Sequence, residues 1–525
     1  MICFTNGMMR RKPLILASLL LAVFVVNLDT SIVNVALPTL VRELHASTST
    51  LQWIVDAYTL VFASLLLAFG SLSDRVGRKG VLLAGLGVFG LASVAGGLTT
   101  TPGQLIAARC VMGLGAAMIF PATLSVISNV FTERSERALA IGLWGATVGA
   151  AFALGPLVGG WLLEHFSWAS IFVAMAPVAA LGAALIALTV PTSRDPKAPK
   201  TDRLGVLLST AGMGLLTYTI IEAPSQGWGS ARTLLGFALA AALLGAFIAW
   251  QRRAAEPLLD VGLFRNLRFS AASGSVTIVF FALAGFIFMV TQYFQFLKGY
   301  GPLSTGVRQL PVAGSIAVTS VLGTKLAVRY GTKVVVVTGS LLLVGFFAWV
   351  STFSAGTSYL EIAVLMVVGG TGTGFTSAPA TEAIMGVVPK AKAGVGSAIN
   401  DASRLVGATL GVAVIGSVFN SLFSSRLTAS LPAAVPAPAA HAAHSSIGAA
   451  LEAAHRTAIG GHPAAGAQLY DAASSAFFSG WSTGCLVAAA VSTAGAIMAA
   501  LLLPAQPLGT EPQRVQVAAE PVSAD

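Results

Sequence analysis

Fourteen apolar stretches, each long enough to cross a lipid bilayer, restrict how this chain can fold more than any other feature. About 20 consecutive apolar residues span the hydrocarbon core as a helix, because each backbone polar group must be satisfied within the segment. Only 10% of the 525 residues are charged. We therefore expect an all-α polytopic membrane protein embedded in the bilayer. The predicted spans are residues 14–34, 50–70, 80–98, 104–127, 138–163, 168–190, 204–222, 232–250, 269–291, 306–328, 333–352, 360–383, 397–420 and 477–503.

Lysine and arginine are distributed unevenly between the two predicted faces of the membrane. With the N-terminus inside, 23 of the 30 basic residues fall on the inner side and 6 on the outer side, and Arg109 lies within a span. Basic residues concentrate in the cytoplasmic loops of membrane proteins. The bias predicts cytoplasmic N- and C-termini in a bacterial plasma membrane. Because the basic residues lie in short loops, the net charge of +10 does not indicate a nucleic-acid partner.

A very short polar segment separates the second and third predicted spans. It extends from Gly70 to Lys79 and places four charges within six residues. A partial copy, from Arg329 to Lys333, follows the tenth span. If spans seven and eight are set aside, this copy also follows the second span of a six-helix unit. We therefore expect two parallel six-helix repeats with two inserted helices, the symmetry of an alternating-access carrier.

This repeat predicts four parts of the chain. Residues 1–199 form a six-helix bundle, residues 200–253 two inserted helices, and residues 254–503 a second six-helix bundle. Residues 504–525 form a disordered cytoplasmic tail. Within the second bundle, residues 420–476 form a long outer loop rich in alanine, proline and serine.

The long outer loop and the cysteines give no indication of a metal site. Two histidines, His441 and His444, lie close together in the loop, but no carboxylate or thiol is near them. A flexible or loosely helical cap is therefore expected there. Three cysteines stand far apart, without the spacing of a disulfide framework or a zinc site. These cysteines are Cys3, Cys110 and Cys485.

Ionisable residues inside membrane spans are costly and are therefore functional candidates. Asp29, Asp56 and Arg109 are predicted to lie at one depth in the outer half of the membrane. Arginine keeps its proton, whereas a carboxylate in a low dielectric can be neutral or charged, so such a group can act as a proton switch. The alternative to a proton switch is a static ion pair. For Asp56 a second alternative is an interfacial side chain that reaches water. Interfacial or loop-pairing roles are expected for Glu222, Glu382 and Asp401.

The fifth predicted span is rich in glycine and contains one proline. Proline removes a backbone donor and glycine permits close helix contact, so this span is either a hinge or an ordinary small-residue packing surface. Its distinctive residues are Gly145, Gly149, Gly155, Pro156, Gly159 and Gly160.

No sequence motif indicates an enzyme. The chain contains no Walker loop, no G-x-S-x-G elbow and no H-E-x-x-H pair, and its glycine-rich runs lie inside spans. We therefore expect neither enzymatic activity nor a cofactor, and no bound metal.

Several of these stretches together resemble the major facilitator superfamily, and within it the fourteen-span drug:proton antiporter family. The segment from Gly70 to Lys79 is similar to the loop signature of the superfamily. Residues Leu28–Pro38 resemble a signature of the fourteen-span family, Arg109–Ala117 the span-four motif, and Gly155–Gly160 the antiporter motif of span five. Further similar stretches are 257–265, Gln292–Tyr300 and Asn400–Gly416.

The resemblance implies a proton-driven exporter of amphipathic small molecules, with protons and substrate as its partners. It implies proton transfer at Arg109, and it leaves the oligomeric state open, with a monomer as the expectation. Two alternatives stay open: a dedicated exporter of one natural product or siderophore, and a membrane sensor that does not transport. The loop residues implied to govern the conformational change are Gly70, Asp74, Arg75, Gly77, Arg78 and Lys79.

Overall fold

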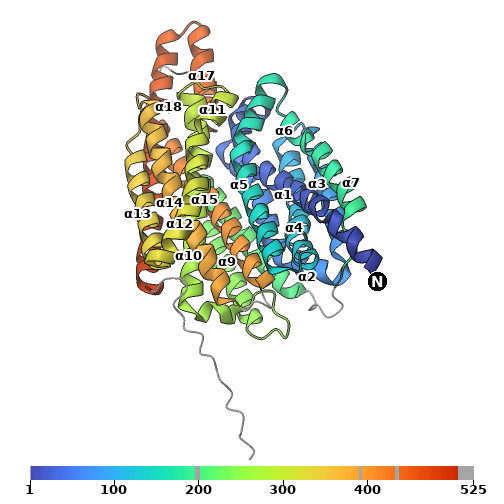
Figure 1. The fold of residues 1–525 in the computed structure, drawn as a ribbon. Helices are drawn as coiled ribbons and strands as arrows, with labels where there is room; N and C mark the ends of the chain where they lie inside the picture. Colours follow the sequence, from blue (N-terminus) through green and yellow to red (C-terminus); the bar gives the residue numbers. More distant parts are fainter. Residues whose placement is uncertain (1, 195–201, 389–392, 432–434, 436, 506–525) are drawn as a thin grey trace, which may run out of the picture.

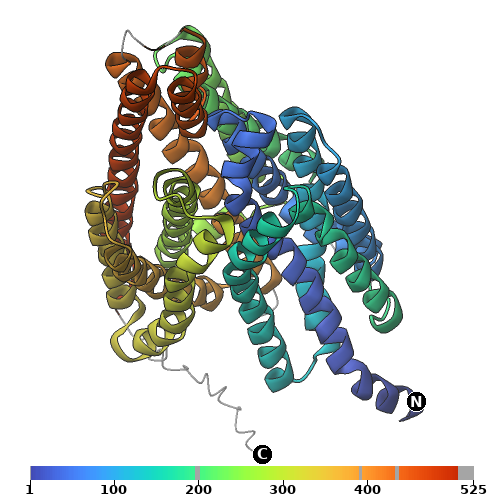
Figure 2. The same ribbon diagram turned by 90° about the horizontal axis from the view of Figure 1, so that it is seen from above.

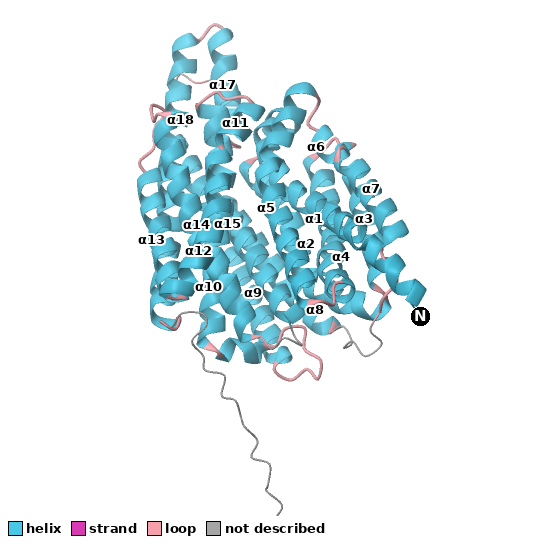
Figure 3. Cartoon of the chain, in the orientation of Figure 1, coloured by secondary structure: helices cyan, strands magenta, loops and turns pink. Residues whose placement is uncertain are grey.

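The computed structural model describes residues 2–194, 202–388, 393–431, 435 and 437–505, and all regular structure within these residues is helical (Figure 3). Fourteen helical segments in this part of the chain are long and apolar enough to cross a membrane. The prediction of an all-α protein with fourteen spans is therefore confirmed. The predicted disordered tail lies almost entirely in residues 506–525, outside the described residues.

The first six spans form the first half of the molecule. Five consist of one helix each, and the sixth is interrupted between two helices. The helices are α1 (Ile2–Leu44), α2 (Thr48–Val76), α3 (Arg78–Gly97), α4 (Pro102–Val130), α5 (Arg134–His165), α6 (Ser170–Val173) and α7 (Met175–Thr189). Two inserted spans follow, α8 (Arg203–Gln226) and α9 (Ala231–Gln251).

The described part of the second half contains six further spans and three short helical elements outside them, η1, α16 and α17. In its first span an α-helix passes into a π-helical segment, η2. Its elements are η1 (Val261–Arg265), α10 (Leu267–Gln292), η2 (Tyr293–Leu297), α11 (Pro302–Arg308), α12 (Leu310–Tyr330), α13 (Thr332–Val350), α14 (Tyr359–Val387), α15 (Ala393–Ser430), α16 (Ala437–Ala443), α17 (Ile447–Ile459) and α18 (Pro463–Leu502).

The helices run between two faces of the molecule. Figure 1 places α11 and α17 at one end, which we call the cap face, and the N-terminus at the other end, which we call the terminal face. Viewed from above, the blue-to-teal first half and the yellow-to-red second half lie side by side (Figure 2).

The repeated polar segment forms the same turn in both halves. Gly77 alone separates α2 from α3, and Gly331 alone separates α12 from α13. Both glycines have positive φ, 130° and 91°, a conformation that residues with a Cβ rarely adopt. The internal repeat seen in the sequence thus has a direct structural counterpart at the terminal face.

The apolar core shows where the two halves are joined. One large buried cluster includes Leu40 and Ile54 of the first half together with Phe286 and Ile415 of the second. A separate cluster, around Phe269, contains residues of the second half only, at its terminal side. The halves therefore share a core toward the cap face, while the second half keeps its own core toward the terminal face.

The inserted helix α8 packs across the seam between the halves, touching both α2 and α15. The Trp53 ring of α2 lies 6.2 Å from the Tyr218 ring of α8. Asp202 caps α8 by accepting a hydrogen bond from the Gly205 amide, and it also accepts from the Trp250 and Gln251 side chains of α9. One carboxylate thus holds the two inserted helices together.

The segment predicted as a long outer loop contains two short helices between two long ones. Helix α15 continues to Ser430, α18 begins at Pro463, and α16 and α17 lie between them. The Thr48 amide of α2 donates to the Ser445 carbonyl in this cap over 3.1 Å, so the cap also touches the first half. Among the described residues, no three potential metal ligands come together, although the His441 side chain is outside that part.

Candidate functional site

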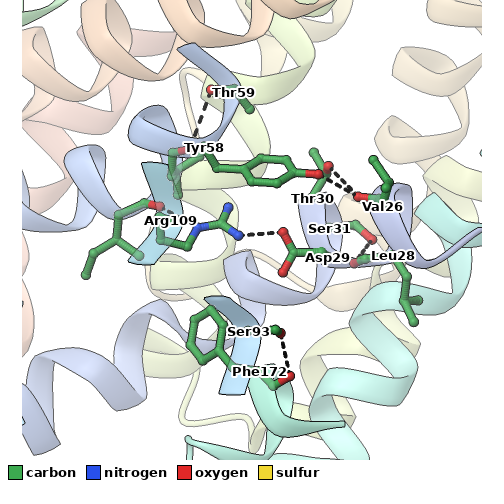
Figure 4. A network of polar contacts seen from close by, with 12 residues as sticks. Val26, Leu28, Asp29, Thr30, Ser31, Tyr58, Thr59, Ser93, Arg109 and Phe172 are labelled. Carbon is green, nitrogen blue, oxygen red and sulfur yellow. Dashed lines mark hydrogen bonds and ion pairs between the residues drawn. The ribbon is translucent and has the colours of Figure 1, made fainter. Parts of the chain in front are cut away.

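A buried ion pair between α1 and α4 is the centre of the candidate site. Arg109 Nη1 of α4 lies 2.5 Å from Asp29 Oδ2 of α1 (Figure 4). Arg109 is 1% exposed and Asp29 is fully buried. The second carboxylate oxygen of Asp29, Oδ1, is also buried and has no hydrogen-bond partner. The structure therefore brings together two of the three predicted coupling residues and leaves one oxygen of the acid unused.

The guanidinium is held from two further directions by α2. Arg109 Nε donates to the Ile54 carbonyl over 2.9 Å, and the guanidinium carbon lies 4.3 Å from the centre of the Tyr58 ring. The Tyr58 hydroxyl in turn donates to the Val26 carbonyl of α1 over 3.0 Å. A cation over an aromatic face is stabilised electrostatically, so Arg109 stays in place between three helices.

Asp56 lies on another face of α2, although it shares the depth of the pair. Ile54 and Tyr58 are the two residues of α2 that touch Arg109. They stand two positions before and two positions after Asp56, and each is therefore about 200° from Asp56 around the helix. Gln52 and Thr59, which share a stripe with Asp56, both contact α15. Asp56 is fully buried and neither of its carboxylate oxygens has a hydrogen-bond partner. The structure therefore places this acid toward the seam with the second half.

The remaining acids inside spans lie away from this pair. Glu222 is half-buried near the end of α8, where its oxygens accept from the Ser225 hydroxyl. Asp401 of α15 is 7% exposed, and Glu382 of α14 is half-buried. Their predicted loop partners include Lys390 and Lys392, which lie outside the described residues. That pairing stays a prediction.

The predicted gating loop is tied to the first half by its acid. Asp74 Oδ1 accepts from Arg78 Nε over 2.7 Å and from the Ser125 hydroxyl of α4 over 2.6 Å. Lys79 donates to the Ala187 carbonyl of α7. The remaining loop residues are Gly70, which faces Pro121 of α4, the exposed Arg75, and Gly77 at the turn.

The glycines of α5 separate into two groups by their surroundings. A Cβ at Gly145 or Gly149 would meet nothing within 4 Å. A Cβ at Gly155 would overlap the Ser31 hydroxyl of α1, whose hydroxyl already donates to the Ala151 carbonyl. The distinction shows which glycines permit close helix contact.

The second group touches both halves of the molecule. A Cβ at Gly159 would meet Ile32 of α1, and one at Gly160 would overlap the main chain of Leu303 in α11. The Pro156 carbonyl lies where a Cβ of Gly306 in α11 would stand. The predicted antiporter motif thus packs against the helix that carries Asp29 on one side and against the second half on the other.

Sequence reasoning missed the residues that link the two halves by hydrogen bonds. Gln52 of α2 and Gln295 of η2 were not predicted as site residues, and neither was Tyr58. Gln295 lies in the stretch Gln292–Tyr300, whose resemblance to a family gave no role. A polar side chain inside a predicted span was the signal that could have identified Gln52 and Tyr58, whereas Gln295 lies just beyond the predicted span 269–291.

Comparisons with known proteins agree with the fold. The profile of the Major Facilitator Superfamily matches residues 19–412. The multidrug efflux pump LfrA of Mycolicibacterium smegmatis is 34% identical over 92% of this chain and 94% of its own length. The tetracenomycin C resistance and export protein of Streptomyces glaucescens is 34% identical over 78% of this chain and 76% of its own. Among solved structures, a bacterial homologue of the human lysosomal transporter Spinster has a TM-score of 0.63 at 16% identity, covering 93% of this chain and 96% of that one.

Proposed function

Because the chain belongs to the Major Facilitator Superfamily, we propose that it is a secondary transporter that exports amphipathic small molecules in exchange for protons. The buried Asp29–Arg109 pair carries the proposal. An isolated charge pair inside a membrane protein is costly, and replacing it by apolar residues is often neutral or stabilising. Its presence is therefore better explained by a task that needs a titratable group than by stability.

The pair is suited to proton exchange because only one partner can change its charge. Arg109 remains a cation, whereas Asp29 can exist as a carboxylate or as an acid. Protonation of Asp29 would weaken its attraction to Arg109 and loosen α1 from α4. Asp56, also buried but facing the seam, is proposed as a second protonation site.

The contacts of α5 support a link between that protonation and the opening of the molecule. Gly155 packs against Ser31 and Gly159 against Ile32 of α1, within one turn of Asp29. Gly160 packs against α11 of the second half. A movement of α1 would therefore be transmitted through α5 to the contact that joins the halves at the cap face. We propose that this contact separates when the carrier opens outward.

We further propose the orientation and surroundings of the transporter. The basic loops favour a cytoplasmic terminal face, with both termini inside, in the plasma membrane of a bacterium. The shared core near the cap face then makes the described conformation the inward-facing one. We also propose that the four parts with boundaries at residues 199, 253 and 503 are its structural units, and that it works as a monomer without chemical conversion of the substrate.

A dedicated exporter is the second candidate, because one similar protein is named for resistance to a single antibiotic, tetracenomycin C. Another is named a multidrug efflux pump. Growth of cells expressing the chain, tested against several unrelated dyes and antibiotics, distinguishes the two candidates. Protection against one compound alone would favour the dedicated exporter.

The deciding experiment is transport by the purified chain in proteoliposomes with an imposed pH gradient. A panel of cationic dyes is loaded, and dye movement is recorded together with internal pH. We expect dye movement and proton movement in opposite directions, and we expect dye movement to stop when a protonophore collapses the pH gradient. Dye binding without any gradient-dependent movement would instead favour a membrane sensor.

A further inference from the structure

Two glutamine side chains, one from each half, donate hydrogen bonds to the main chain of the opposite half. Gln52 Nε2 of α2 lies 3.1 Å from the Val412 carbonyl and 3.0 Å from the Ala413 carbonyl of α15. Gln295 Nε2 of η2 lies 2.8 Å from the Val35 carbonyl of α1. Both side chains are buried, at 0% and 7% exposure.

We propose that Gln52 and Gln295 are positioning residues that hold the cap face closed, and we call the two together the amide clasp. The proposal rests on the alternating-access function proposed above. Each amide donates to a backbone carbonyl that still has a second lone pair available. When the halves separate, water can replace these bonds, so the clasp releases at small cost. A reversible closure needs contacts of this moderate strength.

The structure gives Gln52 a prepared place in the second half. Gly416 of α15 leaves room for its amide, since a Cβ there would lie 2.6 Å from Gln52 Nε2. The amide also lies 3.2 Å from the Ser417 hydroxyl. Two turns along, the Thr59 hydroxyl of α2 is 3.0 Å from that of Thr409. Polar side chains on the stripe of α2 that also carries Asp56 therefore join α2 to α15 across the seam.

Gln295 is held in position by the aromatic residues around η2. The Tyr293 ring is fully buried, lies 5.1 Å from the Trp481 ring, and its hydroxyl donates to the Ser354 carbonyl. A π-helical segment changes the direction in which side chains project from a helix, and such segments are frequent at functional sites. Here η2 directs Gln295 across the seam, which gives a role to the stretch Gln292–Tyr300.

Neither amide titrates, so the clasp should act independently of pH. This property separates it from the proposed proton sites at Asp29 and at Asp56, which lies one turn from Gln52 on the same stripe of α2; the charge of either acid would change with pH. The amide clasp then contributes a constant free energy to the closed state of the cap face, and protonation of the acid determines when the cap face opens.

The test measures the cap face directly by the distance between spin labels. Labels are attached through Gly103→Cys at the start of α4 and Gly356→Cys between α13 and α14, two exposed positions where no neighbouring atom crowds an added side chain within 3.4 Å. The native cysteines are replaced by serine. Distances are recorded in nanodiscs at pH 5.5 and pH 8, without substrate.

The two matched variants each remove one buried amide, and they differ in whether that amide donates to the opposite half or to its own helix. Gln295→Met removes the bond to the first half, whereas Gln292→Met removes a bond from an equally buried amide to the Phe288 carbonyl of its own helix. We expect Gln295→Met, and likewise Gln52→Met, to raise the ratio of cap-open to cap-closed molecules about fivefold at both pH values. We expect Gln292→Met to leave the ratio unchanged.

Several outcomes would overturn the amide clasp. Equal ratios for Gln295→Met and Gln292→Met would do so, as would a shift present at one pH only. If Gln52→Met fails to fold, Gly416→Ala tests the same contact by displacing the amide, and an unshifted ratio there contradicts the proposal. Absence of any transport in proteoliposomes, with the distance shifts intact, would refute the proposed function and leave the clasp standing.

Discussion

Arg109 and Asp29 form an ion pair of 2.5 Å in the interior of the first half, where neither side chain is more than 1% exposed. The pair joins α4 to α1, and the Tyr58 ring covers the guanidinium. The same α1 contacts Gly155 and Gly159 of α5, and the neighbouring Gly160 packs against the second half. The two residues therefore connect a titratable group to the contact between the halves.

Substitution of Asp29 by asparagine is the direct test of this connection. Asp29→Asn keeps the size of the side chain but removes the proton exchange, and it leaves Arg109 as a buried cation without a counter-charge. We expect transport driven by a pH gradient in inverted vesicles to fall at least tenfold, while dye binding persists. Asp29→Glu, which keeps the acid, should retain part of the flux. Unchanged flux in Asp29→Asn would exclude this acid from coupling.

Arg109 was found from the sequence, and so was its partner, because depth in a membrane can be counted along the chain. Rarity also helped, since Arg109 is one of only a few basic residues that fall inside the predicted spans. Asp56 lies at the same depth as the pair, but its side chain points in another direction around the helix. Which neighbouring helix that side chain meets depends on how the helices pack together. A shift of two residues turns a side chain about 200° around the helix, and sequence periodicity in an almost wholly apolar span does not show which face meets which neighbour.

The number of spans and the repeat were likewise predictable. The length of the apolar stretches predicts the number of spans, and the matching turn glycines Gly77 and Gly331 indicate the repeat. The contacts between the halves were not predictable, because a glutamine that donates to a distant main-chain carbonyl leaves no complementary side chain in the sequence. Gln295 and its acceptor at Val35 are an example.

The glycines of α5 allow a matched comparison on one helix. Gly160→Ala places a Cβ on the main chain of Leu303, whereas Gly149→Ala places one in open space. We expect Gly160→Ala to separate α5 from α11, increase the open fraction of the cap face and reduce transport severalfold. Gly149→Ala should transport normally, because alanine is the better helix former. Labelled distances across the cap face and dye flux measure both effects, and equal behaviour of the two variants would contradict the packing role.

We expect Asp74 to affect the proposed gating movement more than the stability of the fold. Its pair with Arg78 spans one turn of chain and is partly exposed, so its contribution to the free energy of unfolding is under about 1 kcal/mol. We expect Asp74→Asn to lower the maximal transport rate while the melting temperature and the substrate affinity stay nearly constant. Flux at saturating dye, together with thermal unfolding in detergent, gives the comparison. An unchanged rate would count against a gating role.

We expect Asp56 to lower the thermal stability of the folded chain while taking part in proton coupling. Both of its carboxylate oxygens are buried without a hydrogen-bond partner, and each such group costs roughly 1–3 kcal/mol. Asp56→Leu keeps the number and branching of the side-chain heavy atoms but has no polar atom, and should therefore raise the apparent melting temperature. Its pH-driven flux should fall if the acid takes part in coupling. A lower melting temperature would mean that Asp56 stabilises the closed seam through contacts other than hydrogen bonds.

The α8–α9 pair should depend on pH through Asp202, which lies just outside the membrane-spanning segments. Burial raises the pKa of this carboxyl, but the hydrogen bonds from Gly205, Trp250 and Gln251 outweigh it and hold the pKa below its usual value of 3.8. A lowered pKa in the folded state means that the stabilising contribution is complete above pH 3.8 and is lost as the pH falls through the lower, folded-state value.

Replacing Asp202 by alanine should therefore destabilise the chain near neutral pH. Loss of the helix cap costs about 1 kcal/mol, so a slightly lower melting temperature is expected at pH 7. The difference from the unmodified chain should narrow below pH 3.8. Thermal unfolding followed by tryptophan fluorescence between pH 3 and pH 7 provides the measurement. Asp260→Ala is the comparison, since this second carboxylate caps η1 by accepting from the Gly262 amide. A difference that stays constant across this range would show that the charge of Asp202 has no part in holding α8 to α9.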